Sequence, residues 1–229
     1  MSWVITGSQP IPAVIGEPFG GGYFAGYISH TADGNPTHAL IVAPRATGAT
    51  GSGYPLTTNL KWADETVSVP ANSTLIGASS SFDGKANTDL MMSLIAAGTY
   101  SAGAFPAAQF CADLSIGGYT DWYLPSRYEM DIAYFNLKPS TQTNDIGWGT
   151  NIYSVPRRSK NYSLDYPMQT NLTAFKTASQ AFVDLRHWAS TETNATLGWF
   201  VNLSTGGQSY SFKESNNLNQ VRAFRRIAL

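Results

Sequence analysis

The acidic side chains are the residues of this sequence best suited to catalysis. Asp121, Glu129, Asp131 and Glu192 could in principle supply the two carboxyl groups of a glycoside hydrolase. Nothing in their spacing brings any two together, and Glu129 follows Ser126 by three residues, which is the spacing of a helix capping box. We therefore expect no catalytic residue, and a glycan hydrolase is the least favoured alternative.

The histidines and the single cysteine show no spacing typical of metal ligands. None of His30, His38 and His187 lies at a ligand interval from a histidine, cysteine or acidic residue. Cys111 alone can form neither an intrachain disulfide nor a thiolate site, and its helical setting predicts a buried side chain. Residues 83–89 could hold calcium weakly, but a turn and a helix N-cap explain them, and the terminal acid of an EF-hand is missing. We expect no metal and no cofactor.

Composition excludes several partners. Charged residues are 13% of the chain and the formal net charge is −1, with neutral polar residues in their place. The basic clusters (Arg157-Arg158 with Lys160, and Arg222 with Arg225-Arg226) are too small to hold nucleic acid by phosphate contacts. No apolar run approaches a membrane span and no secretory signal opens the chain, so we expect no membrane insertion and synthesis in a host cytoplasm. The neutral surface is typical of an extracellular or virion protein, or of one packed in an assembly.

Hydrophobic patterning predicts strands towards both ends of the chain and helices in its middle. The expected strands, with a hairpin turn at residues 32–36, cover residues 23–28, 39–43, 188–190, 199–203, 209–212 and 221–227. The expected helices cover residues 86–97, 105–114, 126–138 and 175–182. This order indicates an α+β fold whose termini can meet in one sheet.

Two segments lack periodicity. Residues 1–20 are rich in proline and glycine, which predicts an extended N-terminal arm or linker, or else a disordered terminus. Residues 138–174 are rich in Asn, Thr, Ser and Tyr. A loop of that length inside a compact domain is usually either functional or poorly ordered.

Three segments, in this order, resemble the C-terminal domain of collagen-like bacterial adhesins, a domain also found in phage and prophage proteins. Residues 117–130 (GGYTDWYLPSRYEM) resemble the family's G-G-x-x-D-W-x-L-P-[ST]-x-x-E-L. Residues 188–192 (WASTE) resemble W-S-S-T-E, with Ala189 in place of the first serine, and residues 221–226 (VRAFRR) resemble V-R-x-V-R. Residues 21–26, 39–44 and 137–139 look like a phage-associated version of the same protein type.

The resemblance implies a C-type-lectin-like fold, with small twisted antiparallel sheets and two to three helices. It implies one such domain over residues 21–229, with an N-terminal β region at 21–80 and the family motifs at 117–229. A related fold houses cysteine-dependent formylglycine-generating oxidases, and the single Cys111 argues against that activity. The motif residues that we expect to be structural are Asp121, Trp122, Pro125, Ser126, Glu129, Trp188, Glu192, Arg222 and Arg225. We expect Glu192 to pair with Arg222 or Arg225 as a buried clasp.

The resemblance also implies recognition rather than turnover. We expect a non-enzymatic phage virion protein of the tail, fibre or capsid surface that binds a host-surface glycan or protein. Because flat aromatic side chains stack on sugars and anchor protein contacts, the expected ligand-binding residues are Trp148, Tyr153, Tyr162, Tyr166, Trp199 and Tyr210. Expected partners are other virion proteins or further copies of the chain, as a homo-oligomer such as a trimer. The alternatives are a purely structural decoration or adaptor protein and a bacterial adhesin domain.

Overall fold

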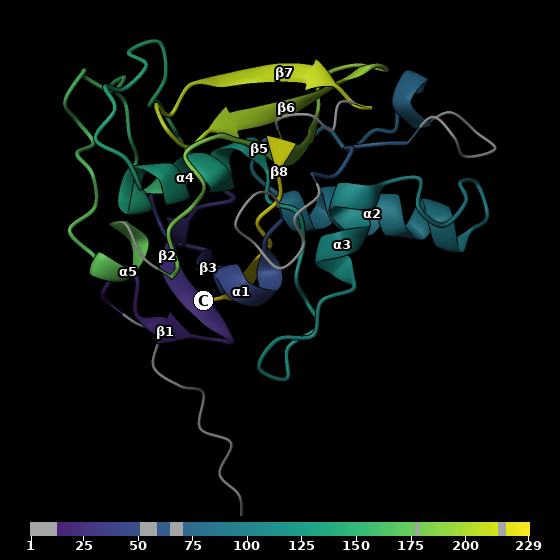
Figure 1. Cartoon of the computed structure of the whole chain (residues 1–229), viewed down its shortest axis with the longest axis horizontal. Coiled ribbons are helices and arrows are strands. Elements are labelled where there is room, and N and C mark those ends of the chain that lie inside the picture. The colour runs from purple at the N-terminus through teal and green to yellow at the C-terminus, as the bar shows by residue number, and fades with distance from the viewer. Residues whose placement is uncertain (1–12, 51–58, 65–70, 177–178, 215–218) are drawn as a thin grey trace, which may run out of the picture.

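The structure is a computed structural model that describes residues 13–50, 59–64, 71–176, 179–214 and 219–229. Two sheets and several helices form a mixed α+β architecture, which confirms the expected fold class at that level (Figure 1). Among the described residues, no helix has both the length and the hydropathy needed to cross a bilayer.

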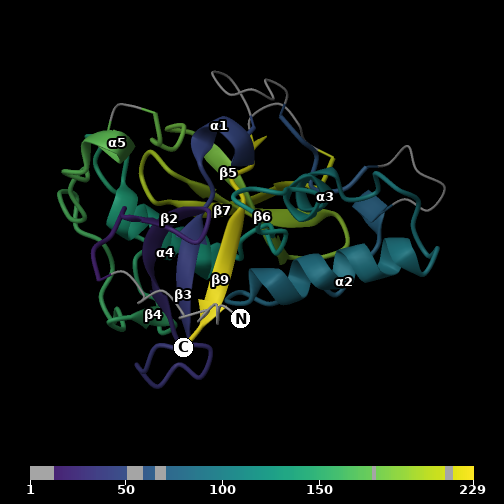
Figure 2. The same cartoon turned by 90° about the horizontal axis from the view of Figure 1, so that it is seen from below.

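The first sheet joins the two ends of the chain, as the sequence predicts. Its strand order is β1-β2-β3-β9, and β4 pairs with β2. The strands are β1 (Pro18–Phe19), β2 (Gly22–Ile28), β3 (His38–Val42), β4 (Ser154–Val155) and β9 (Phe224–Ala228). Figure 2 shows β9 running alongside β3 to the C-terminus.

The second sheet has the order β7-β6-β5-β8, with β8 parallel to β5. Its strands are β5 (Arg186–Glu192), β6 (Leu197–Asn202), β7 (Gln208–Phe212) and β8 (Asn219–Gln220). The closing strand expected at residues 221–227 starts later, as β9 in the first sheet, and the short strand β8 before it belongs to the second sheet. Residues 221–223 cross between the two sheets, and their backbone pairs with residues 48–50 and with Ala43, which follows β3.

The three longer helices begin where the sequence predicts, within about two residues. They are α2 (Gly84–Ala96), α3 (Pro106–Ala112) and α4 (Arg127–Leu137). The remaining helices are single turns: α1 (Arg45–Gly48), a 3₁₀ turn (Ala71–Ser73) and α5 (Thr173–Lys176). The helix expected over 175–182 is instead the single turn α5, which begins at Thr173; residues 179–182 are not helical, and residues 177–178 lie outside the described residues.

The N-termini of α2 and α4 meet at one buried carboxylate. Ser126 and Glu129 form the predicted capping box. The same Glu129 also accepts hydrogen bonds from the Gly84 backbone N–H (3.0 Å) and the Tyr123 hydroxyl (2.7 Å). Burial raises the pKa of Glu129, opposed by its hydrogen bonds to Ser126. This contact fixes the start of α4 against α2, because both helix ends share one acceptor.

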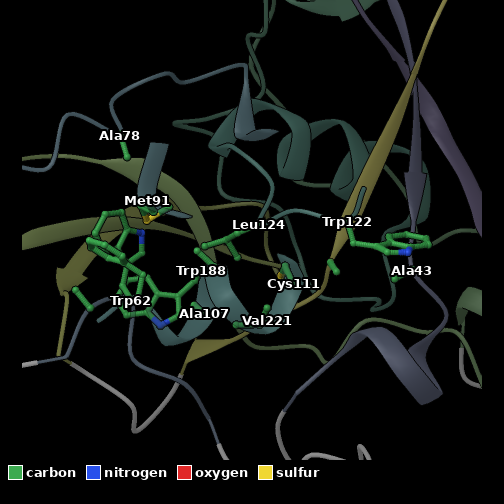
Figure 3. Close-up of a cluster of buried hydrophobic side chains, with 14 of the residues drawn as sticks. Ala43, Trp62, Ala78, Met91, Ala107, Cys111, Trp122, Leu124, Trp188 and Val221 are labelled. Carbon is green, nitrogen blue, oxygen red and sulfur yellow. The ribbon is translucent and has the colours of Figure 1, made fainter. Parts of the chain in front are cut away.

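The core is divided into two clusters on opposite faces of the first sheet, since Ile41 of β3 belongs to one and Leu40 to the other. Trp62, Trp188, Met91 and Cys111 belong to one buried cluster, drawn in Figure 3. The two indole N–H groups donate to backbone carbonyls, Trp62 to Ala189 (2.9 Å) and Trp188 to Leu60 (2.8 Å). The second cluster packs the buried side of α4 onto the first sheet, with Ile28, Leu40, Met130 and Tyr134 among its members. Cys111 is fully buried, as expected.

The described end of the predicted arm belongs to the domain. Gly16 N–H donates to Phe24 O (2.7 Å), Phe24 N–H donates to Glu17 O (2.9 Å), and β1 pairs with β2. Residues 1–12 of the predicted arm lie outside the described residues.

Candidate functional site

Arg127, the first residue of α4, lies among aromatic rings at the surface. Its guanidinium carbon is 4.1 Å from the centre of the Trp199 ring, 4.7 Å from Tyr128 and 5.7 Å from Trp148. Its Nε donates to Gln208 Oε1 (3.1 Å), which helps to hold the group over the Trp199 ring. Burial lowers the pKa of Arg127, whereas Tyr128 and Asp131 raise it. Stacking and the hydrogen bond together fix the direction of the guanidinium.

Three of the predicted ligand-binding residues meet around this arginine. Trp199 contacts two rings edge to face. Its ring centre is 6.1 Å from that of Trp148 and 6.0 Å from that of Tyr210. Trp199 and Tyr210 are direct cross-strand partners on β6 and β7. Tyr210 is 53% exposed, and the two tryptophans are half-buried. We call Arg127, Trp148, Trp199 and Tyr210 the Arg127 surface.

Tyr162 and Tyr166 lie elsewhere, around the side chain of Phe135 on α4. Two neighbouring hollows of about 150 Å³ and 370 Å³ share Phe135, Arg158 and Tyr166 as walls. Tyr166 is 57% exposed and contacts Phe135 edge to face at 5.5 Å. Tyr162 is only 5% exposed, and its hydroxyl donates to Asp131, so it supports the larger hollow from below. We call this pair of cavities the Phe135 hollows.

Tyr153 belongs to neither place. It stacks on Phe82 with ring centres 4.2 Å apart and an interplanar angle of 18°, and it is half-buried. The structure therefore divides the six predicted residues among three locations. The sequence missed Arg127, Phe135 and Arg158, although Arg127 lies inside the 117–130 motif and Arg158 inside a noted basic cluster.

The predicted clasp between Glu192 and Arg222 or Arg225 is wrong. Glu192 pairs with Lys213 at 2.6 Å and accepts from the backbone N–H groups of Ile76 and Gly77, both at 2.7 Å. Arg225 pairs with Asp121 through two hydrogen bonds of 2.7 and 3.0 Å. The reason is that residues 221–223 leave the second sheet, so the arginines end up away from the end of β5.

The remaining motif residues hold the scaffold. Trp122 and Trp188 are buried, and Ser126 caps α4. Pro125 O accepts from the backbone N–H of Ser190 (2.8 Å), which ties two of the motif segments together. Arg222 is fully buried, and its Nε donates to Ala43 O (2.7 Å).

The carboxylates considered for catalysis all have structural partners. Asp121 pairs with Arg225, Glu129 joins two helix ends, and Glu192 pairs with Lys213. Asp131 is buried and bonded to Arg158, Tyr162 and Asn151, and burial raises its pKa. No two of them converge on the Arg127 surface or in the Phe135 hollows.

Among the described residues, no group of three or more His, Cys, Asp or Glu side chains is arranged to hold a metal ion. Asp83 accepts from the Ala86 backbone N–H (2.8 Å) as the N-cap of α2, and it pairs with Arg226 (2.6 Å). The rings of His30 and His38 are in contact, with centres 4.4 Å apart and planes tilted by 38°, and burial lowers the pKa of His30 to about 4. His187 is buried inside the second sheet, where desolvation lowers its pKa to about 3.

The chain was compared with family models, curated proteins and solved structures. No family model and no curated protein matches the chain. A solved structure of a fimbrial protein from Bacteroides ovatus aligns with 81% of this chain at 16% identity and a TM-score of 0.43. The chain spans 35% of that protein's length.

Proposed function

We propose that this chain is a non-enzymatic recognition module of a virion surface protein, in the tail, a fibre or the capsid surface. It binds a host-surface glycan or protein and adopts a C-type-lectin-like form of the α+β fold. The 117–130, 188–192 and 221–226 motifs, which resemble the collagen-like adhesin domain, support the choice of family. The proposed partners within the particle are other virion proteins or further copies of the chain, for example in a trimer.

The observation that carries the proposal is the Arg127 surface. Trp199 and Tyr210 present aromatic faces and edges of the kind that stack on sugar rings or anchor protein contacts. The Nη groups of Arg127 make no hydrogen bond to a residue within the described ranges. A guanidinium held by stacking keeps its planar donors for the hydroxyl, carboxylate or carbonyl oxygens of a ligand.

The test compares two exposed aromatic residues of the same strand. Tyr210 belongs to the Arg127 surface, whereas Phe212 is 62% exposed and lies two residues further along β7 on the same face. Purified chain is applied to a glycan microarray and to envelope fractions of candidate host bacteria. We expect Tyr210→Ala to lose at least about tenfold in binding, as for a hot-spot aromatic, with the melting temperature unchanged.

Phe212→Ala is the matched control and should bind as the unchanged protein does. Equal losses for the two variants would contradict the assignment to the Arg127 surface. If the unchanged protein is retained by no glycan and no envelope fraction, receptor recognition itself is refuted.

A purely structural role is the second candidate, and one observation favours it. The 138–174 segment exposes Ile146, Leu164 and Met168, with 57%, 55% and 70% of their surface in solvent. Such side chains are suited to burial against a neighbouring subunit. Charged replacements at Leu164 and Met168 would then block particle assembly, while adsorption of assembled particles would stay intact.

A further inference from the structure

The Phe135 hollows combine an apolar cavity with a polar, basic one. Phe135 and Ile132 come from one face of α4, three residues apart, and Val155 and Pro156 come from β4 and the turn after it. The pairing of β4 with β2 positions that wall. In Figure 1 the segment after α4 runs beside this helix, on the far side from α2 and α3.

The smaller hollow has room for one ring-sized apolar group. Its volume of about 150 Å³ equals that of an engineered apolar protein cavity known to take up benzene. Its walls include Ile132, Phe135, Val155, Pro156 and Tyr166. A phenyl or leucyl side chain that entered it would exchange water for apolar contacts on several sides.

The larger hollow is lined by hydrogen-bonding groups and positive charge. Ser159, Lys160, Asn161 and Ser163 line it together with the shared aromatic wall. Lys160 is exposed and forms neither a hydrogen bond nor an ion pair within the described ranges, whereas the ammonium group of Lys138 donates to neighbouring uncharged oxygens. The lining contributes no acidic side chain, and the Asp131 carboxylate behind it already pairs with Arg158, so the attraction for a carboxylate placed here comes mainly from Lys160.

Arg158 connects the two hollows and is incompletely bonded. Its Nη2 donates to Asp131, and its guanidinium carbon lies 4.4 Å from the centre of the Phe135 ring. Its Nε and Nη1 are buried and have no hydrogen-bond partner among the described residues. A buried donor without an acceptor costs about 1–3 kcal/mol, so a shift of the Arg158 guanidinium towards an oxygen acceptor in the hollow would remove an existing penalty.

We propose that the Phe135 hollows bind a peptide segment of a partner protein in which a ring-sized apolar side chain lies next to an acidic residue. The apolar side chain fills the smaller hollow, and the carboxylate lies in the larger one near Arg158 and Lys160. The segment binds as a turn, because successive side chains of an extended strand point to opposite faces, whereas those of a turn can enter two cavities that share a wall. This inference deepens the proposed function, since it names the chemistry of a protein partner at a second surface of the module. A sugar is the weaker fit because the walls of the smaller hollow are mainly apolar.

The test uses the full chain and three synthetic peptides in an NMR titration of backbone amides. Ac-Ser-Phe-Asp-Ser-NH2 should shift the signals of Val155, Arg158 and Tyr166 with weak, saturable affinity. Ac-Ser-Ala-Asp-Ser-NH2 lacks the ring and should bind at least about tenfold more weakly, as expected for an apolar anchor. Ac-Ser-Phe-Asn-Ser-NH2 keeps the ring without the charge and should be weakened about twofold to fivefold.

Two lysine variants separate the charge contribution from general electrostatics. Lys160→Glu should weaken the Phe-Asp peptide about threefold to tenfold and leave the Phe-Asn peptide nearly unaffected. Lys176→Glu, an exposed lysine of α5 outside the hollows, should change neither affinity. Both lysines are exposed, so both variants are expected to fold.

Three results would overturn the proposal: no shift at the hollows with the Phe-Asp peptide, equal affinity for all three peptides, or equal effects of the two lysine variants. Shifts at the hollows with methyl glycosides, and none with peptides, would assign the site to sugars instead. Because the readout is local to residues 154–166, a failure here is distinct from a failure of binding at the Arg127 surface.

Discussion

The buried ion pair between Lys213 and Glu192 gives the most direct test of the packing described above. The side chains of both residues are almost inaccessible to solvent, at 0% and 1% exposure. Lys213 Nζ also donates to Thr74 O (2.9 Å) and Ala195 O (2.8 Å). The ammonium group therefore has three oxygen acceptors, and the Glu192 carboxylate has three donors, two of them backbone N–H groups.

Lys213→Met keeps a similar volume and removes the charge. It leaves a buried carboxylate held by two backbone N–H groups alone, and breaking a buried pair on one side costs about 3–5 kcal/mol. Since a domain of this kind has about 5–15 kcal/mol of stability in total, the variant should lose a large fraction of it. The double variant with Glu192→Gln should recover part of the loss, with a coupling energy of about 2–3 kcal/mol.

The exposed pair between Lys85 and Asp89 on α2 is the matched control. Its charged atoms are also 2.6 Å apart, but Lys85 and Asp89 are 34% and 60% exposed. Lys85→Met should therefore cost no more than about 0.5 kcal/mol. Urea unfolding followed by far-UV circular dichroism measures the unchanged protein, the single variants Lys213→Met, Glu192→Gln and Lys85→Met, and the double variant. If Lys213→Met costs less than about 1 kcal/mol at unchanged m-value, the pair is not buried as described and the reasoning fails.

Two further stability predictions follow from other buried groups. His187 has a folded pKa of about 3 against an ordinary 6.5, so the unfolded chain binds more protons between these values and stability falls as pH drops from 6.5. The loss of stability should reach about 2 kcal/mol by pH 5. His187→Gln should therefore flatten the plot of urea midpoint against pH between 6.5 and 5, and an unchanged slope there would show that His187 does not cause the loss. Gly84→Ala places a methyl group 2.4 Å from both Glu129 Oε2 and Ser126 N, so urea unfolding should show a loss of about 2–3 kcal/mol in stability. Gly103→Ala is the control: no atom lies within 4 Å of its new methyl group, so only the strain of its positive φ should destabilise the protein.

The features that the sequence predicts well depend on neighbouring residues. The Ser126–Glu129 capping box, the proline at the start of α3 and the hairpin of β2 and β3 follow from short-range patterns. What the patterns do not contain is the second role of Glu129 as acceptor for Gly84, which comes from a helix 45 residues earlier. The partner of Glu192 was missed for the same reason, because strand order decides which cation reaches the end of β5.

The 138–174 segment shows a different limit. It carries no hydrophobic period, because buried polar side chains organise it in place of an apolar face. Asn144 Nδ2 donates to the carbonyls of Ser163, Leu164 and Pro167, and Lys138 Nζ donates to Asn144 Oδ1 (2.8 Å). A pattern of Asn and Ser residues is the same whether these side chains face solvent or backbone carbonyls. Hence the sequence could not separate the buried Tyr162 from the exposed Tyr166.

The two candidate surfaces are positioned by one face of one helix. Arg127, Asp131 and Phe135 follow one another at intervals of four residues on α4, so their side chains are aligned along it. Gln208 bonds Arg127 Nε at 3.1 Å and lies 3.4 Å from Asp131 Oδ1, and Asp131 in turn holds Arg158 and Tyr162. The Arg127 surface and the Phe135 hollows are therefore joined by a continuous buried polar chain. The capping box that begins α4 thereby sets the position of both, although neither of its residues touches either surface.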